Sequence, residues 1–177
     1  PFIMAGINTR VVRRTNALLD EEYGNGFSYR EVLTFPKSWK GRARAEVMRV
    51  GLGAMIGMIA LGPTRSLLQK TVLPAPGEGP SKEEREAGYF NLTLIGRGMK
   101  PNGGSFKVKA DIHGDKDPGY AGTAVMLAEA ALCLVLNRAD LPERYGILTP
   151  ASAMGAALLK RLRDAGMEFR VETLGAD

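Results

Sequence analysis

The chain has 177 residues, a formal net charge of +5, and 45% hydrophobic against 24% charged residues. This balance is typical of a globular chain with a real core and excludes an intrinsically disordered one. The single cysteine, Cys133, excludes an intramolecular disulfide, and the single histidine, His113, excludes a histidine-rich metal site within the chain. We expect a buried thiol and a hydrogen-bonded structural histidine, with proton transfer by His113 as the alternative.

The first third of the chain predicts a helix, a strand and a second helix. A polar arginine face opposite apolar residues predicts a helix from Asn8 to about Glu22. The aromatic and β-branched run Phe27–Phe35, stopped by Pro36, predicts a strand. From about Arg42 to Leu61 the pattern is helical but interrupted by glycines.

Residues 51–62, at the end of that second helix and just beyond it, carry no charge and are rich in methionine and isoleucine. About 20 apolar residues are needed to cross a bilayer, so this run is too short to span one. Core or dimer packing is the favoured interpretation, and the alternatives are contact with a membrane interface or the lining of a tunnel for an acyl chain. The spacing Gly51-Leu-Gly-Ala-Met-Ile-Gly57 does not match a dinucleotide-binding loop, and no clear strand precedes it.

The remaining elements define the fold class. After a Pro/Gly loop at Pro74–Pro80, a capping-box pattern from Ser81 predicts a short helix. Tyr89–Gly96 and Ser105–His113 predict a long β-hairpin, and the alternation after Met167 predicts a closing strand. Strands from separate parts of the chain with helices between them predict an α+β domain. Its sheet is expected to be mixed, mostly antiparallel, with helices packed on one face.

Two further helices are predicted near the end of the chain. The first begins with Asp117 as a cap and Pro118 at its first position, and it carries one charged residue between Thr123 and Leu136. A helix so apolar on every side is expected to be buried within the fold or at an interface. The second has Thr149 as its cap, Pro150 at its first position and Gly166 as its stop.

Positive charge gathers in two places. Arg10, Arg13 and Arg14 form one cluster, and Lys37, Lys40, Arg42 and Arg44 surround Trp39. Such clusters raise the local concentration of anionic partners, although a solvated basic face is the alternative. Because no nucleic-acid-binding motif accompanies them, nucleic acid is not expected as a partner.

Several segments together resemble a known family. They are Asp117-Pro-Gly-Tyr-x-x-Thr-Ala-x-Met-Leu-x-Glu-x-Ala-Leu, then Leu148-Thr-Pro-Ala-x-Ala-Met-Gly, with supporting segments at the N-terminus and from Pro76. The pattern resembles the C-terminal half of the saccharopine dehydrogenase-like oxidoreductases, in particular their trans-acting enoyl reductase branch. The matching segments follow one another in the expected order across nearly the whole chain.

The resemblance implies a bipartite NAD(P)H-dependent oxidoreductase. Residues 1–177 would be a single C-terminal substrate-binding and dimerisation domain. NADPH or NADH would be bound mainly by an N-terminal Rossmann domain outside this chain, which begins at Pro1 without an initiator methionine. The chain alone would then be catalytically incomplete. The resemblance also implies a cytoplasmic homodimer that acts on an enoyl thioester or related lipid-like substrate, with an acyl-carrier protein as a further partner.

The same segments suggest site residues. Tyr120 is the candidate catalytic proton donor, and the candidate substrate-binding residues are Asn8, Arg10, Gly119, Gly122 and Thr123. The two glycines leave room for another group to approach backbone N–H groups, and tight packing is the alternative. For Asn8 and Arg10 the alternative is a helix start with a surface arginine, and for Tyr120 a packed aromatic ring. No cofactor-binding or metal-binding residue is predicted in this chain.

Two other classes of function stay open. The chain could be a non-catalytic interaction or dimerisation domain that docks on a carrier protein or a lipid surface. It could also be a small complete enzyme that uses no nucleotide, although no catalytic constellation supports that reading.

Overall fold

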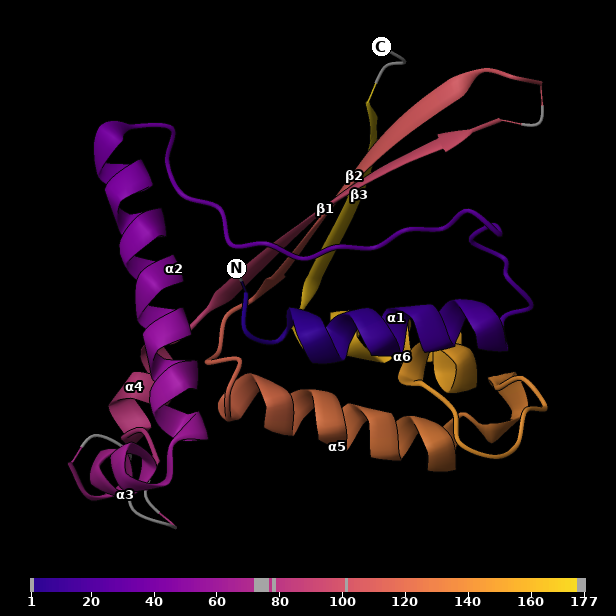
Figure 1. Cartoon of the computed structure of the whole chain (residues 1–177). Helices are drawn as coiled ribbons and strands as arrows, with labels where there is room; N and C mark the ends of the chain where they lie inside the picture. Colours follow the sequence, from indigo (N-terminus) through magenta and orange to yellow (C-terminus); the bar gives the residue numbers. More distant parts are fainter. Residues whose placement is uncertain (1, 72–76, 78, 101, 175–177) are drawn as a thin grey trace. The chain divides into compact units, whose positions relative to one another are not determined.

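The computed structural model describes residues 2–71, 77, 79–100 and 102–174. The chain divides into two compact units, Pro1–Gly79 and Pro80–Asp177, which are described separately below (Figure 1). That the chain forms the single domain expected from its sequence stays a prediction.

The described residues of the first unit form three helices: α1 (Ala5–Leu18), α2 (Trp39–Ala60) and α3 (Gly62–Thr71). Helix α1 ends before the predicted Glu22 because the chain turns sharply there. Asp20 and Glu21 have positive φ angles of 54° and 60°. The side-chain oxygen of Asn16 accepts a hydrogen bond from the Tyr23 N–H at 2.8 Å, which fixes this turn.

The predicted strand over Phe27–Phe35 is wrong. This segment runs extended between α1 and α2 but is paired with no strand of the described chain (Figure 1). Its composition favours an extended backbone, and Phe27 and Tyr29 are half-buried while Ser28 and Arg30 are exposed. A strand also needs a neighbour for its backbone hydrogen bonds, which composition alone cannot supply.

Helix α2 confirms the predicted helix and begins slightly earlier, at Trp39, and it continues through Gly51, Gly53 and Gly57 without a break. Ser38 caps it, because its hydroxyl accepts a hydrogen bond from the Gly41 N–H at 3.1 Å. A side chain at Gly41 would overlap the carbonyl oxygen of Pro36, so this position requires glycine. At Leu61 the chain leaves the helix, and α3 continues in a direction that differs by 113°.

The second unit contains all three described strands. In chain order, the elements of this unit are α4 (Lys82–Ala87), β1 (Phe90–Met99), β2 (Ser105–Gly114), α5 (Ala121–Leu136), the 3₁₀ turn η1 (Arg138–Asp140), α6 (Pro150–Asp164) and β3 (Glu168–Leu174). The strands form one antiparallel sheet in the order β1-β2-β3. This confirms the α+β class, the hairpin, the closing strand and the capping box at Ser81. The predicted loop Pro74–Pro80 lies mostly outside the described residues.

The sheet has one apolar and one polar face, because side chains alternate along each strand and paired residues share a face. The apolar face is built from Leu92, Leu94, Val108, Ala110, Ile112, Phe169 and Val171. Gly98 on the same face leaves space for the Phe106 ring, which lies 2.5 Å from where a Cβ would be. The polar face includes Asn91, Thr93, Lys109, Asp111, His113 and Glu172.

The core of this unit lies between α5 and α6. Cys133 of α5 is fully buried, Met154 of α6 is 5% exposed, and both pack with Leu141. The expected buried thiol is therefore confirmed. The rest of α5 is less buried than its composition predicts, since Leu127 is 69% and Val135 is 74% exposed. Burial of the whole helix within this fold is wrong, and burial at an interface stays a prediction.

Within the described residues, none of the helices is by itself long and apolar enough to cross a membrane. Helices α2 and α3 meet the length and composition requirement when taken together, but the 113° bend separates them.

Candidate functional site

The turn that leads into α5 is a compact hydrogen-bonded unit. The Asp117 carboxylate accepts a hydrogen bond from the Tyr120 N–H at 2.7 Å, and the Asp117 carbonyl accepts one from the Gly122 N–H at 2.7 Å. The Thr123 hydroxyl donates to the Pro118 carbonyl at 2.6 Å. The helix proper therefore begins at Ala121, and the expectation that Pro118 occupies its first position is wrong.

The two glycines of this turn differ in their surroundings. Gly122 is buried, and a Cβ there would lie 3.0 Å from the Asp117 carbonyl oxygen. Gly119 is exposed, and a Cβ there would lie 3.4 Å from the Asp117 carboxylate, an ordinary contact. Tight packing therefore accounts for Gly122. The neighbouring carboxylate disfavours an anionic ligand at Gly119 and leaves a neutral carbonyl as the better-matched group.

Tyr120 directly precedes the first residue of α5, and its side chain is 53% exposed. Its backbone is held by Asp117, so the phenol is attached to a fixed point of the turn. A packed aromatic ring, the alternative for this residue, would be more deeply buried. The phenol is thus accessible to a ligand, and its role as a proton donor stays a prediction.

His113 lies at the end of β2, shortly before the same turn. Its Nδ1 lies 2.8 Å from the Asn91 side-chain oxygen on β1, and its ring lies 6.4 Å from that of Tyr89, centroid to centroid. The expectation of a hydrogen-bonded histidine is confirmed. Asn91 was not singled out from the sequence, because its pairing with His113 follows from the hairpin register.

The two site residues predicted near the N-terminus lie on α1, in the first unit. Asn8 is half-buried, and its side-chain nitrogen donates to the Glu31 carboxylate at 2.9 Å. The same carboxylate accepts from the Tyr29 hydroxyl at 2.6 Å. Burial, the hydrogen bond to Glu31 and the charge of Glu31 together raise the pKa of Tyr29 from 10.0 to about 12. Arg10 is exposed.

The structure therefore brings together Gly119, Tyr120, Gly122 and Thr123 in one turn of the second unit. Asn8 belongs to a different cluster, with Tyr29 and Glu31, in the first unit. A joint site made from both sets stays a prediction. The sequence did not reveal the Asn8 cluster, because its partners lie in a segment that was expected to be a strand.

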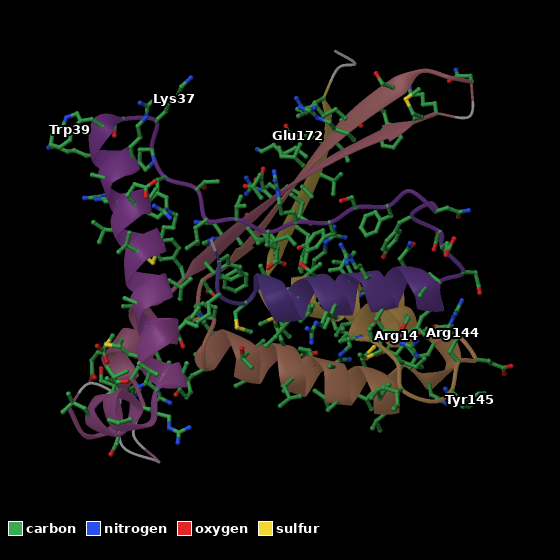
Figure 2. All side chains as sticks on the ribbon, in the orientation of Figure 1. Arg14, Lys37, Trp39, Arg144, Tyr145 and Glu172 are labelled. Carbon is green, nitrogen blue, oxygen red and sulfur yellow. The ribbon has the colours of Figure 1, made fainter. Side chains whose placement is uncertain are left out.

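A second polar group lies on the polar face of the sheet. Lys109 on β2 contacts Asp111 at 2.5 Å and Glu172 on β3 at 3.2 Å, and the Thr93 hydroxyl donates to Asp111 at 2.6 Å. Hydrogen bonds to Asp111 and Glu172 raise the pKa of Lys109, and hydrogen bonds from Lys109 and Thr93 lower the pKa of Asp111. Figure 2 labels Glu172 on this sheet. The strand alternation was the only sequence signal for this group.

Other site types are absent from the described part of the chain. No group of three or more His, Cys, Asp or Glu side chains there is placed to hold a metal ion. Gly51, Gly53 and Gly57 lie inside α2 and form no turn between a strand and a helix, so they do not fit the pyrophosphate of a dinucleotide. A surface hollow at the tip of the β1–β2 hairpin contains none of the predicted site residues.

Comparisons with known proteins point to one kind of relative. A Mycobacterium tuberculosis protein named, provisionally, a trans-acting enoyl reductase is 42% identical over 183 residues, which cover 99% of this chain and 41% of that protein. Proteins named trans-acting enoyl reductase from Mycobacterium ulcerans and Mycobacterium bovis are each 38% identical over 173 residues, covering 94% of this chain and 39% of theirs.

No family model matches the chain, and no solved structure matches it. The sequence is thus similar along nearly its full length to proteins named trans-acting enoyl reductases, and it spans about two fifths of the length of these relatives.

Proposed function

We propose that this chain is the substrate-binding part of an NAD(P)H-dependent oxidoreductase that reduces an enoyl thioester or a related lipid-like substrate. The observation that carries the proposal is the 42% identity over 99% of the chain to a protein named, provisionally, a trans-acting enoyl reductase. The resemblance to the C-terminal half of saccharopine dehydrogenase-like oxidoreductases supports the same assignment.

A nicotinamide cofactor would be bound outside this chain. The glycines at 51–57 lie within a helix, and the described residues contain no strand before them that could begin a dinucleotide-binding unit. When bound, the cofactor supplies the hydride. The present chain would bind and orient the substrate and exclude water from it.

The turn before α5 supplies groups suited to that role. Reduction of an enoyl thioester adds hydride at the β-carbon, develops negative charge on the thioester oxygen and requires a proton at the α-carbon. The exposed phenol of Tyr120 is the proposed proton donor. Gly119 leaves the backbone of the turn open to the thioester carbonyl, and Thr123 and Gly122 fix its shape.

Asn8 and Arg10 are the proposed substrate-binding residues of the first unit. The Asn8 side-chain nitrogen carries two protons, and its 2.9 Å bond to Glu31 uses one of them. The remaining proton and the exposed Arg10 guanidinium would then both be donors to the substrate oxygen. We further propose a cytoplasmic homodimer that receives its substrate from an acyl-carrier protein.

A chimaera tests the proposal directly. The segment of the Mycobacterium ulcerans relative that aligns with this chain is replaced by this chain, and oxidation of NADPH or NADH is followed with enoyl thioesters of different length. Turnover by the chimaera, together with at least a tenfold loss on Tyr120→Phe, is the expected result.

The parent relative is the positive control, and Tyr145→Phe is the matched control for removing an exposed phenol elsewhere in the same unit. A folded chimaera without turnover, beside an active parent, would contradict the proposal and favour a non-catalytic interaction domain. Unchanged turnover in both Tyr120→Phe and Arg10→Ala would remove these two residues from the site.

A further inference from the structure

Helix α2 is divided along its length into a charged half and an uncharged half. Basic residues occupy the segment just before it and its first three turns, whereas residues 50–60 carry no charge. The basic residues are Lys37, Lys40, Arg42, Arg44 and Arg49, and Glu46, the one acidic residue among them, pairs with Arg49 at 2.7 Å. The beginning of α2 is therefore strongly positive.

The uncharged half of α2 is exposed instead of packed. Val50 is 60%, Ile56 is 56% and Leu61 is 61% exposed, and Met58 and Ile59 are also exposed. The sequence favours core or dimer packing for this run, and packing within the core of the described chain is wrong. A contiguous exposed run of this kind marks a surface that another molecule or phase covers.

The corner between α2 and α3 is suited to an apolar environment. At a helix end the last carbonyl groups lack partners within the helix, and such groups are costly to place among hydrocarbon chains. The Thr64 hydroxyl lies 2.6 Å from the Met58 carbonyl oxygen and 3.0 Å from that of Leu61, so its proton is shared between them. The 113° change of direction places Leu61 at the apex of a bent pair of helices.

The dimensions favour an oblique entry into one leaflet. With a rise of about 1.5 Å per residue, residues 51–61 extend about 16 Å, and Trp39 lies about 33 Å from Leu61 along the helix. Because half of a hydrocarbon core is only about 15 Å thick, the apex and Trp39 reach one leaflet together only when α2 is strongly tilted. Arg49 on α2 lies about three turns before the apex, whereas Arg65 on α3 lies one turn after it, with its N–H donating to the Leu61 carbonyl at 2.9 Å. Long arginine side chains can extend toward the headgroups from such positions.

Trp39 lies where a membrane-interface residue is expected. It is 75% exposed at the start of α2, and the Lys40 amine lies 5.7 Å from its ring centroid. Figure 2 shows Trp39 and Lys37 at this end of the helix, with their side chains directed away from the ribbon. Tryptophan beside lysine and arginine is the usual arrangement at the level of lipid headgroups.

We propose that α2 and the α2–α3 corner form a wedge for an anionic membrane surface. The apolar apex around Ile56 and Leu61 enters one leaflet, while Trp39 and the basic residues around it contact the lipid phosphates. A soluble acidic protein would match the basic half, but it would leave the exposed apolar half uncovered. The wedge is independent of the chemistry proposed for the turn before α5.

The test uses the 177-residue chain with vesicles of phosphatidylcholine alone and of equimolar phosphatidylcholine and phosphatidylglycerol. Binding is measured by flotation and by the emission of Trp39, the single tryptophan of the chain. We expect binding to the anionic vesicles with a blue shift of the emission. We also expect at least a tenfold weaker binding when sodium chloride is raised from about 50 to about 500 mM.

Variants separate the two halves of the wedge. Lys40→Glu with Arg44→Glu should weaken binding to anionic vesicles at least about tenfold, and Ile56→Ser with Leu61→Ser by a similar factor. The matched controls are Arg97→Glu with Lys100→Glu, and Leu127→Ser with Val135→Ser, in the second unit. Each control pair makes the same kind of change at exposed positions and should leave binding unchanged.

Quenching of tryptophan fluorescence by brominated lipids measures how deeply each position enters the bilayer, and it leaves all charged residues of the chain unchanged. Lipids brominated near the headgroup should quench Trp39 more than lipids brominated near the acyl end. In a Trp39→Phe, Ile56→Trp variant the order should reverse. No binding to anionic vesicles, equal loss of binding in the control pairs, or quenching that does not differ between the two tryptophan positions would overturn the proposal.

Discussion

Glu129 Oε2 of α5 lies 2.7 Å from Arg161 Nη2 of α6, and each side chain is only 21% exposed. Arg161 also donates to the Asn137 side-chain oxygen at 3.3 Å, while its buried Nε has no hydrogen-bond partner. Glu129 is the one charged residue in an otherwise apolar helix. The pair therefore connects the two helices at the edge of their shared core.

Removing one partner of this pair should destabilise the second unit. Glu129→Ala leaves the partly buried Arg161 guanidinium without its counter-charge, and we expect a loss of about 2–4 kcal/mol in the free energy of unfolding. Urea unfolding followed by circular dichroism measures it. Asp164→Asn breaks the exposed Lys160–Asp164 pair of the same helix and should cost less than about 0.5 kcal/mol. If the two variants lowered the free energy of unfolding equally, the partial burial of the Glu129–Arg161 pair would not explain its contribution to stability.

The turn before α5 predicts a contrast between its two glycines. Gly122→Ala places a Cβ 3.0 Å from the Asp117 carbonyl oxygen and should cost about 1–3 kcal/mol of stability. Gly119→Ala makes an ordinary contact and should leave stability within about 0.5 kcal/mol. Thermal unfolding of both variants beside the wild type is the measurement. A neutral Gly122→Ala would mean that the turn relaxes easily.

The hydrogen bonds that cap the N-terminus of α6 should contribute measurably to the free energy of unfolding. The Thr149 hydroxyl accepts a hydrogen bond from the Ser152 N–H at 3.4 Å, the Ser152 hydroxyl accepts one from the Thr149 N–H at 3.0 Å, and both residues are buried. Thr149→Val keeps the size of the side chain but removes its acceptor, so we expect a loss of about 1–2 kcal/mol. Chemical denaturation measures the loss, with Thr173→Val on the exposed sheet surface as the control. A loss no larger than that of the control would show that the cap is dispensable.

Because the pKa of Tyr29 is raised, the stability of the folded chain should depend on pH in the alkaline range. Its pKa is raised from 10.0 to about 12 in the folded chain, so the unfolded chain loses this proton at a lower pH. The stability it contributes is therefore fully present below pH 10 and is lost as the pH rises from 10 to about 12. The difference in stability between wild type and Tyr29→Phe, measured across this range, isolates the effect.

Absorbance titration of the tyrosines gives an independent check. Glu31→Gln removes the negative charge beside the phenol, so the pKa of Tyr29 should fall but stay above 10.0, because burial is the largest cause of its shift. If the pKa of Tyr29 did not change in Glu31→Gln, its contact with Glu31 would be absent in solution.

The sequence predicts the elements whose signals are local. The capping patterns at Ser81 and Thr149 and the alternation in the hairpin are properties of a few neighbouring residues, and the structure confirms all three. The segment Phe27–Phe35 has the composition of a strand, but pairing is a property of the whole fold. The same limit applies to burial, since the apolar composition of α5 did not reveal which of its faces meets α6.

In the candidate site too, features that depend on adjacent residues could be predicted and features that depend on the whole fold could not. The turn from Asp117 to Thr123 could be predicted as a unit because its residues are adjacent, although the helix begins later than expected, after a backbone hydrogen bond from the Gly122 N–H to the Asp117 carbonyl. The contacts of Asn8 with Glu31 and of His113 with Asn91 could not be predicted. They join residues that are more than 20 positions apart and depend on where separate segments are placed.

The fully buried Cys133 can serve as a chemical probe of how often the core between α5 and α6 opens. As the single cysteine, with no exposed surface, it can react with a thiol reagent only while its packing against α6 and Leu141 is open. The labelling rate in native buffer, compared with the rate in the unfolded chain, therefore reports how often that core opens. Any ligand or partner that holds α5 against α6 should slow this reaction, whichever surface it binds.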